Sequence, residues 1–113
     1  VNDRLGGSFL HVWADRLPAT TEVWAINNLL VGPGAFTTQA PGRYEGNQSV
    51  DRSMLIDADA WEFGLSGRSP LRGQARRPGS FRTQSLEPTA EFVFPAGTRA
   101  LPVGRSLSPG ALH

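Results

Sequence analysis

The chain has no lysine and no cysteine among its 113 residues, so all 11 of its basic residues are arginines. About six lysines would be expected at this length, because roughly a quarter of an average domain is charged. The absence of cysteine excludes disulfides and thiolate metal sites. The absence of lysine excludes the Gly-x-x-x-x-Gly-Lys loop that binds phosphates.

Two explanations account for the arginine bias, and the sequence leaves both open. A GC-rich coding sequence favours arginine codons throughout a chain. Alternatively, the surface has been selected for planar, forked donors, which hold carboxylates or phosphates in bidentate geometry. The second explanation applies best to residues 63–86, where five arginines occur without any Asp or Glu.

Long hydrophobic runs are also missing. No apolar run approaches the ~20 residues of a membrane span, and the first residues do not resemble a signal peptide. We therefore expect no membrane association. The 39% apolar content and the net charge of +1 are typical of a single ordered globular domain.

Signals for catalysis are sparse. The Gly-x-Ser-x-Gly motif of hydrolases is absent. Of the two histidines, His11 lies in an alternating run, where a structural role is more common than a catalytic one, and His113 is the last residue. We expect no enzyme and no cofactor. A catalytic site would have to use His11 with three carboxylates, Asp57, Asp59 and Glu62.

These carboxylates have an alternative interpretation as ligands. Alternate positions place Asp57 and Asp59 on one face of an extended strand, which suits a hard cation such as calcium or an acid/base pair for glycoside hydrolysis. A calcium loop needs further oxygen ligands and a glycine at fixed offsets, and these are missing. We expect the carboxylates to be solvated or paired with arginines such as Arg43 and Arg52, and we expect no metal site.

Turn-forming residues are abundant, with 13 glycines and nine prolines spread along the chain. They leave no room for an amphipathic helix of ordinary length. The segments between them predict an all-β fold, a small β-sandwich or barrel of about five to seven short antiparallel strands. Residues 1–103 would form this domain, with a turn at 95–97, and residues 104–113 would form an extended tail.

The first two extended runs, 8–14 and 22–31, are expected to form an antiparallel hairpin. This pairing places Trp13 and Trp24 opposite or diagonal to each other, a favourable aromatic pair. Both tryptophans would then be core residues. A helix over residues 20–30, capped by the Thr20-Thr21-Glu22 sequence, is the competing prediction.

Residues 63–86 carry a charge of +5, whereas the remainder of the chain carries −4. Proline and glycine prevent regular structure there, which predicts a long exposed loop or arm. Its guanidinium groups suit an acidic patch on a neighbouring subunit, or a nucleic-acid backbone with Phe81 stacked on a base. A solvated loop without a partner is the third interpretation. Together with the tail, the candidate partner-binding residues are Arg68, Arg72, Arg76, Arg77, Phe81, Arg82, Arg105 and Leu107.

Aromatic residues suggest a separate site. Trp61 lies among polar residues and is expected to be partly exposed. Exposed aromatic rings flanked by polar side chains bind sugar rings, so Trp61 and Tyr44 are candidate glycan contacts.

These patterns favour a protein that acts by association. The leading hypothesis is a non-catalytic structural or accessory subunit of a large assembly, in particular a virus or phage particle with a decorating or cementing role. The tail and the arginine-rich loop would bind neighbouring subunits, in a virion or another extracellular particle. The alternatives are a carbohydrate-binding module and a nucleic-acid-binding protein that uses residues 68–82.

Overall fold

The structure is a computed structural model that describes residues 6–37, 40–93 and 95–110. The described residues form short strands and two 3-10 helices, so the all-β prediction is confirmed. In chain order the elements are β1 (Ser8–Leu10), η1 (Ala14–Arg16), β2 (Val23–Ile26), β3 (Leu29–Val31), β4 (Ala35–Phe36), β5 (Gly42–Glu45), β6 (Gln48–Val50), η2 (Arg52–Met54), β7 (Leu55–Asp57), β8 (Glu62–Leu65), β9 (Ser80–Phe81), β10 (Gln84–Ser85), β11 (Ala90–Phe92) and β12 (Thr98–Ala100).

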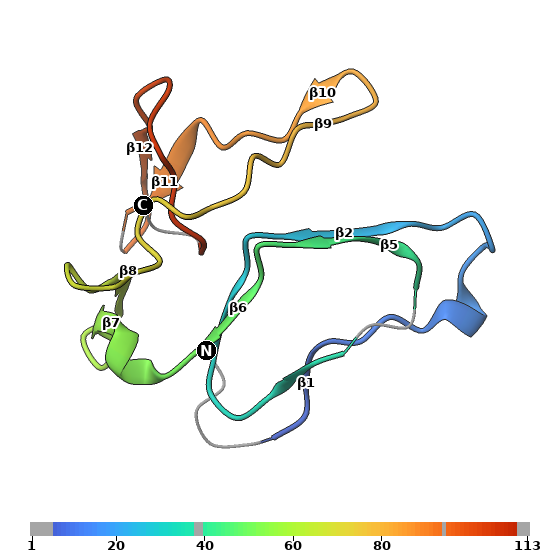
Figure 1. Cartoon of the computed structure of the whole chain (residues 1–113), viewed down its shortest axis with the longest axis horizontal. Coiled ribbons are helices and arrows are strands. Elements are labelled where there is room, and N and C mark those ends of the chain that lie inside the picture. Colours follow the sequence, from blue (N-terminus) through green and yellow to red (C-terminus); the bar gives the residue numbers. More distant parts are fainter. Residues whose placement is uncertain (1–5, 38–39, 94, 111–113) are drawn as a thin grey trace.

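The first half of the chain is a coil of two turns. Strands β1, β2 and β3 of the first turn pair in parallel with β4, β5 and β6 of the second. Val23 lies opposite Gly42 and Leu29 opposite Gln48, a constant separation of 19 residues. Figure 1 shows β2 and β5 side by side, with the chain returning through a wide loop. Successive turns stacked in parallel are the arrangement of a solenoid.

The predicted antiparallel hairpin between residues 8–14 and 22–31 is therefore wrong, and so is the competing helix over 20–30. The linker between the two runs holds η1 and is too long for a tight hairpin turn. Trp13 is 51% exposed rather than buried and stacks on His11 at 4.5 Å. Trp24 is half-buried and forms a T-shaped ring pair with Phe81.

A polar corner at Asn47 and a close backbone approach at Gly42 hold the turns of the coil in register. The Asn47 carbonyl Oδ1 accepts hydrogen bonds from the backbone and side-chain amides of Asn28, at 3.0 and 2.8 Å. The Asn47 amide in turn donates to the Ala25 carbonyl at 2.8 Å. At Gly42 the strands approach so closely that a Cβ atom would lie 1.8 Å from the Val23 carbonyl oxygen. Glycine is required at this position.

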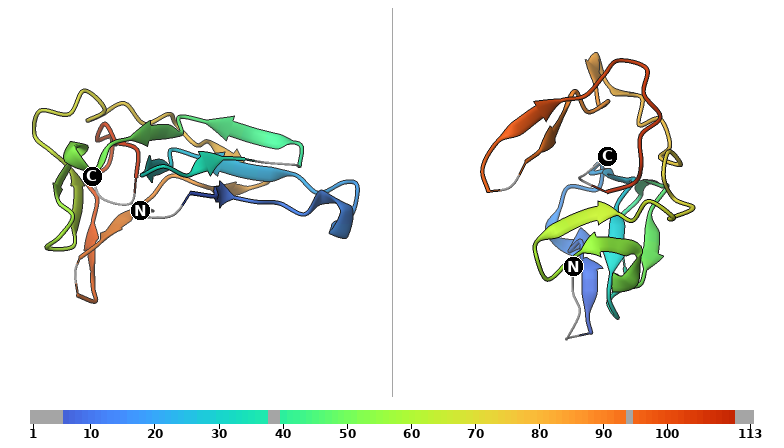
Figure 2. Two further views of the ribbon diagram at one scale, coloured as in Figure 1. Left: turned by 90° about the horizontal axis from the view of Figure 1, so that it is seen from below. Right: turned by 90° about the vertical axis from the view of Figure 1, so that its left-hand side faces the viewer.

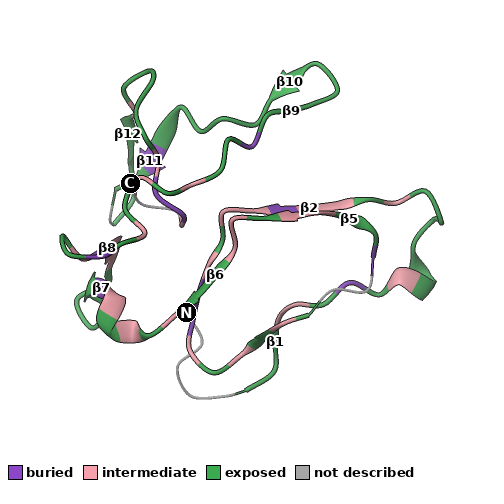
Figure 3. Ribbon diagram, in the orientation of Figure 1, coloured by how far each residue is buried: buried purple, intermediate pink, exposed green. Residues whose placement is uncertain are grey.

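The hydrophobic core is small. Figure 3 shows buried residues only at scattered points along the ribbon. The accessible surface is 7962 Å², whereas a compact monomer of 12.2 kDa exposes about 6,100 Å². The Cα radius of gyration is 15.1 Å, against about 13 Å for a compact domain of this length. Besides Pro78 and Pro109, the buried apolar side chains among the described residues are Val12, Ala25, Leu30, Val31, Ala40, Leu55 and Leu65.

The second half consists of three antiparallel hairpins, β7–β8, β9–β10 and β11–β12. Figure 2 shows β11 and β12 on one side of the molecule and the two-turn coil on the other. The expected turn at residues 95–97 connects β11 to β12, where the Val93 amide donates to the Gly97 carbonyl at 3.0 Å. In total, the described strands form six two-stranded sheets, three of them parallel. The expectation was about five to seven antiparallel strands, whereas the described strands number twelve and three of their six pairs are parallel.

Candidate interaction surfaces

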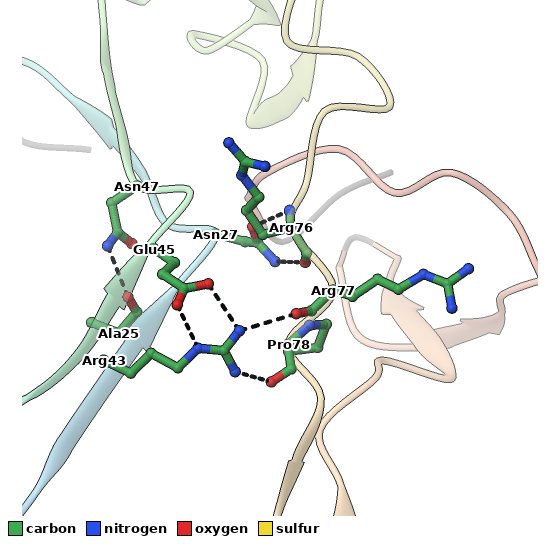
Figure 4. A network of polar contacts seen from close by, with 8 residues as sticks. All are labelled: Ala25, Asn27, Arg43, Glu45, Asn47, Arg76, Arg77 and Pro78. Atoms are coloured by element: carbon green, nitrogen blue, oxygen red, sulfur yellow. Dashed lines mark hydrogen bonds and ion pairs between the residues drawn. The ribbon is translucent and has the colours of Figure 1, made fainter.

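The arginine-rich segment is fastened to the coil at the corner between β2 and β3. The Asn27 side chain donates from Nδ2 to the Arg76 carbonyl at 2.7 Å and accepts from the Arg76 amide at 2.8 Å. Figure 4 shows these two bonds side by side. A side-chain amide that pairs with both backbone groups of one residue fixes that residue in position. The segment is therefore not a free arm at this point.

Arg43 on β5 provides a second attachment. Its guanidinium donates to both carboxylate oxygens of Glu45 at 2.8 Å and to the Pro78 carbonyl at 2.6 Å. The hydrogen bond from Arg43 lowers the pKa of Glu45, and the positive charges of Arg43 and Arg76 lower this pKa further. The same bond raises the pKa of Arg43. We call the contacts of Asn27 and Arg43 with residues 76–78 the latch.

The tail is also attached to its own chain as far as it is described. The Leu107 carbonyl accepts from the Ala75 amide at 2.9 Å, and the Ser108 hydroxyl accepts from the Gly73 amide at 3.0 Å. The Gly110 amide donates to the Asn27 carbonyl at 2.7 Å. Residues 111–113, including His113, lie outside the described residues.

Four of the eight predicted partner-binding residues line one hollow of about 730 Å³, which we call the basic hollow. Three of them are arginines, and Glu87 is the acidic residue of its lining. Figure 4 shows the guanidinium groups of Arg76 and Arg77 extending away from the latch. The latch therefore uses backbone groups of the segment and not the guanidinium groups of these two arginines. The four predicted residues are Arg76, Arg77, Arg105 and Leu107.

The other predicted partner-binding residues lie elsewhere. Arg72 donates to the Leu65 carbonyl at 3.1 Å, whereas Arg68 is exposed. The guanidinium of Arg82 lies 5.4 Å from the centre of the Phe81 ring. The structure thus divides the charged segment into several surfaces.

The carboxylates considered for catalysis have structural contacts. Asp57 accepts hydrogen bonds from the amides of Asp59 and Ala60, both at 3.1 Å, and holds the tip of the β7–β8 hairpin. Asp59 forms an ion pair with Arg52, as the expected pairing with arginine predicts, and Glu62 is exposed on β8. Across residues 6–37, 40–93 and 95–110, no group of three or more His, Asp or Glu residues is placed to hold a metal ion.

The two candidate glycan contacts are not brought together. Trp61 is 63% exposed, in agreement with the prediction, and its backbone has a positive φ of 63°. Hollows of about 650 and 680 Å³ have Trp61 in their linings. Tyr44 is half-buried, with its hydroxyl donating to the Ala40 carbonyl at 2.7 Å and its ring against Phe36. Tyr44 lines neither of these hollows.

One charged pair was missed in the sequence. Glu91 on β11 lies directly opposite Arg99 on β12, and its carboxylate accepts from Arg99 Nε at 2.7 Å. The Glu91 side chain is only 2% exposed. The expected turn did not reveal this pair, because a turn confined to residues 95–97 would place Glu91 opposite Leu101, two residues from the observed register.

Comparisons with protein-family profiles, curated proteins and solved structures found no match. Within the part of the chain that the structure describes, no helix is both long and apolar enough to cross a membrane. The functional conclusion therefore rests on the surfaces described above.

Proposed function

We propose that the chain is a non-catalytic structural subunit of a large assembly, and that it binds neighbouring protein subunits, including further copies of itself. The observation that carries this proposal is the excess of exposed surface. The chain exposes about 1,900 Å² more than a compact monomer of its mass. Each partner in a standard protein interface buries about 800 Å². The excess is thus enough for contacts with two neighbours.

Strand β2 has a paired strand on one edge only among the described residues, which supports the same conclusion. Alternate residues of a parallel ladder face the paired strand. The amides of Val23 and Asn27 donate to carbonyls of the second turn, those of Pro41 and Glu45. The backbone groups of Trp24 and Ile26 consequently point away from β5. A row of such groups accepts a further strand, and a two-stranded sheet gains stability from one because it is marginal alone.

In this proposal, strands from a neighbour complete the two-stranded sheets. The β-sandwich or barrel expected from the sequence would then belong to the assembled state. The basic hollow would receive an acidic segment of another subunit, because it has three arginines and one glutamate in its lining. Among large assemblies we favour a virus or phage particle. The cysteine-free β composition and the arginine-rich segment support this choice.

Light scattering with absorbance at 260 and 280 nm tests the proposal. We expect a protein-only oligomer whose mass exceeds that of the 12.2 kDa chain and whose absorbance ratio does not change with nuclease. A folded monomer at every concentration would contradict the proposal. A high 260/280 ratio that falls after nuclease treatment would instead favour the nucleic-acid alternative.

A further inference from the structure

The larger hollow beside Trp61, of about 680 Å³, has aromatic walls. Trp61 lies at the β7–β8 hairpin, and its ring forms a T-shaped pair with that of Phe63, with the ring centres 5.9 Å apart. Phe92, which is 49% exposed, contributes from β11. We call this hollow the Trp61 cleft. It has room for a ligand of two or three rings, because ligand pockets are typically 300–1,000 Å³.

The backbone of Trp61 supports a functional role for this ring. A φ of 63° places it in the left-handed region, which bulky residues rarely adopt. Such a strained conformation is unfavourable and persists only where the surrounding structure imposes it. The side chain is nonetheless 63% exposed. Core packing therefore does not explain why a strained position holds a tryptophan.

The polar lining of the Trp61 cleft is balanced in charge. Arg72 and Arg99 contribute two positive charges, and Glu62 and Glu91 contribute two negative charges. Arg99 is held by Glu91, and one nitrogen of Arg72 is held by the Leu65 carbonyl. Both arginines are thus oriented before any ligand binds. Each guanidinium has five N–H donors, and the carboxylates accept hydrogen bonds.

We infer that the Trp61 cleft binds a neutral saccharide. A sugar ring has an apolar face that packs on an aromatic ring, and each of its hydroxyl groups both donates and accepts hydrogen bonds. The cleft provides both kinds of contact. An acidic ligand would lie beside the exposed carboxylate of Glu62, and a purely apolar ligand would leave the charged lining without hydrogen bonds to water. This inference is independent of the proposed assembly.

Binding is tested with neutral hexasaccharides of glucose, mannose, xylose and galactose, using the full chain, calorimetry and tryptophan fluorescence. We expect at least one of these probes to bind and to change the fluorescence of the wild-type protein. Trp61→Ala should weaken that binding at least ten-fold. Arg99→Lys, which retains the charge but loses the planar fork, should weaken it several-fold.

Trp13→Ala is the matched control, because Trp13 is similarly exposed and is absent from the lining of the Trp61 cleft. This variant should bind the probe as the wild type does. Circular dichroism establishes that each variant is folded. The inference is overturned if none of the four probes binds at millimolar concentration, or if Trp61→Ala and Trp13→Ala bind equally well. Tighter binding of hexagalacturonic acid than of every neutral probe would overturn the assignment to neutral saccharides.

Discussion

At the scale of single residues, Asn27 connects three parts of the chain. Its amide donates to the Glu45 carbonyl at 2.9 Å, its carbonyl accepts from Gly110 at 2.7 Å, and its side chain holds both backbone groups of Arg76. Its φ of 59° is in the left-handed region, which asparagine tolerates better than most residues. One residue thus joins the coil, the arginine-rich segment and the tail.

Two substitutions separate the side-chain role of Asn27 from its backbone role. Asn27→Gly keeps the backbone conformation accessible but removes two hydrogen bonds, so we expect it to lower the free energy of unfolding by about 1–2 kcal/mol. Asn27→Ala loses the same bonds and adds the cost of a left-handed alanine, about 1 kcal/mol more. Urea denaturation measures both values. Equal stability of Asn27→Gly and the wild type would show that the latch does not contribute.

The ion pair of Glu45 predicts a dependence on pH. Its pKa in the folded protein lies below the ordinary value of 4.5, because Arg43 hydrogen-bonds to its charged form. The unfolded chain therefore binds the proton more readily. The contribution of this pair to stability is complete above about pH 4.5 and is lost as the pH falls through the lowered pKa. A nuclear magnetic resonance titration of the Glu45 carboxyl should give a midpoint below 4.5.

A variant isolates this contribution. In Glu45→Gln, the difference in stability between pH 6 and pH 3 should be smaller than in the wild type, because the titrating group is gone. Urea denaturation at the two pH values measures this difference. An identical pH dependence in the variant and the wild type would contradict the role assigned to Glu45.

At the scale of elements, extended segments could be predicted, but their partners could not. Alternating residues and frequent turns indicated strands, and the turn at residues 95–97 was located correctly. Alternation does not determine which strands pair or in which direction. The parallel register depends on contacts between Asn47 and the first turn of the coil, 19 and 22 residues away in sequence.

The same limit applies to the candidate sites. The exposure of Trp61 followed from its polar neighbours, whereas the attachment of residues 76–78 did not follow from their charge. The latch is formed by backbone groups of this segment and by the side chains of Asn27 and Arg43. The prediction of a loose arm used only the charges of the side chains. It could not foresee that the backbone of residues 76–78 is bound by Asn27 and Arg43.

Gly42 provides a test of the parallel register. An alanine Cβ at this position would overlap the Val23 carbonyl oxygen, so β2 and β5 would have to separate. We expect Gly42→Ala to lower the free energy of unfolding by more than about 2 kcal/mol, in the range of severe backbone effects. Gly67→Ala is the matched control, because its Cβ would have no atom within 4 Å. Urea denaturation should show little change in the control. Equal stability of the two variants would contradict the register.

At the scale of the whole molecule, the proposed assembly predicts that stability depends on neighbours, which would cover exposed surface and pair with free strand edges. The described core contains few side chains, and the sheets have two strands each. An isolated two-stranded sheet is marginal in water. Assembly would therefore contribute part of the folding free energy, and the apparent midpoint of thermal unfolding should rise with protein concentration.

Ile26 allows the edge of β2 to be blocked without breaking its pair with β5. Its amide points away from β5, since the amides of Val23 and Asn27 point toward the second turn of the coil. Ile26→Pro removes an outward donor and places a ring in the path of an incoming strand. We expect its mass in light scattering to fall to that of the monomer. Ile26→Ala shortens the side chain but keeps the amide, so this control should retain the oligomer. Circular dichroism checks that both variants fold.

An oligomer that survives in the proline variant would exclude the edge of β2 as the contact. The basic hollow would then be the surface to test, with the double variant Arg76→Glu and Arg77→Glu.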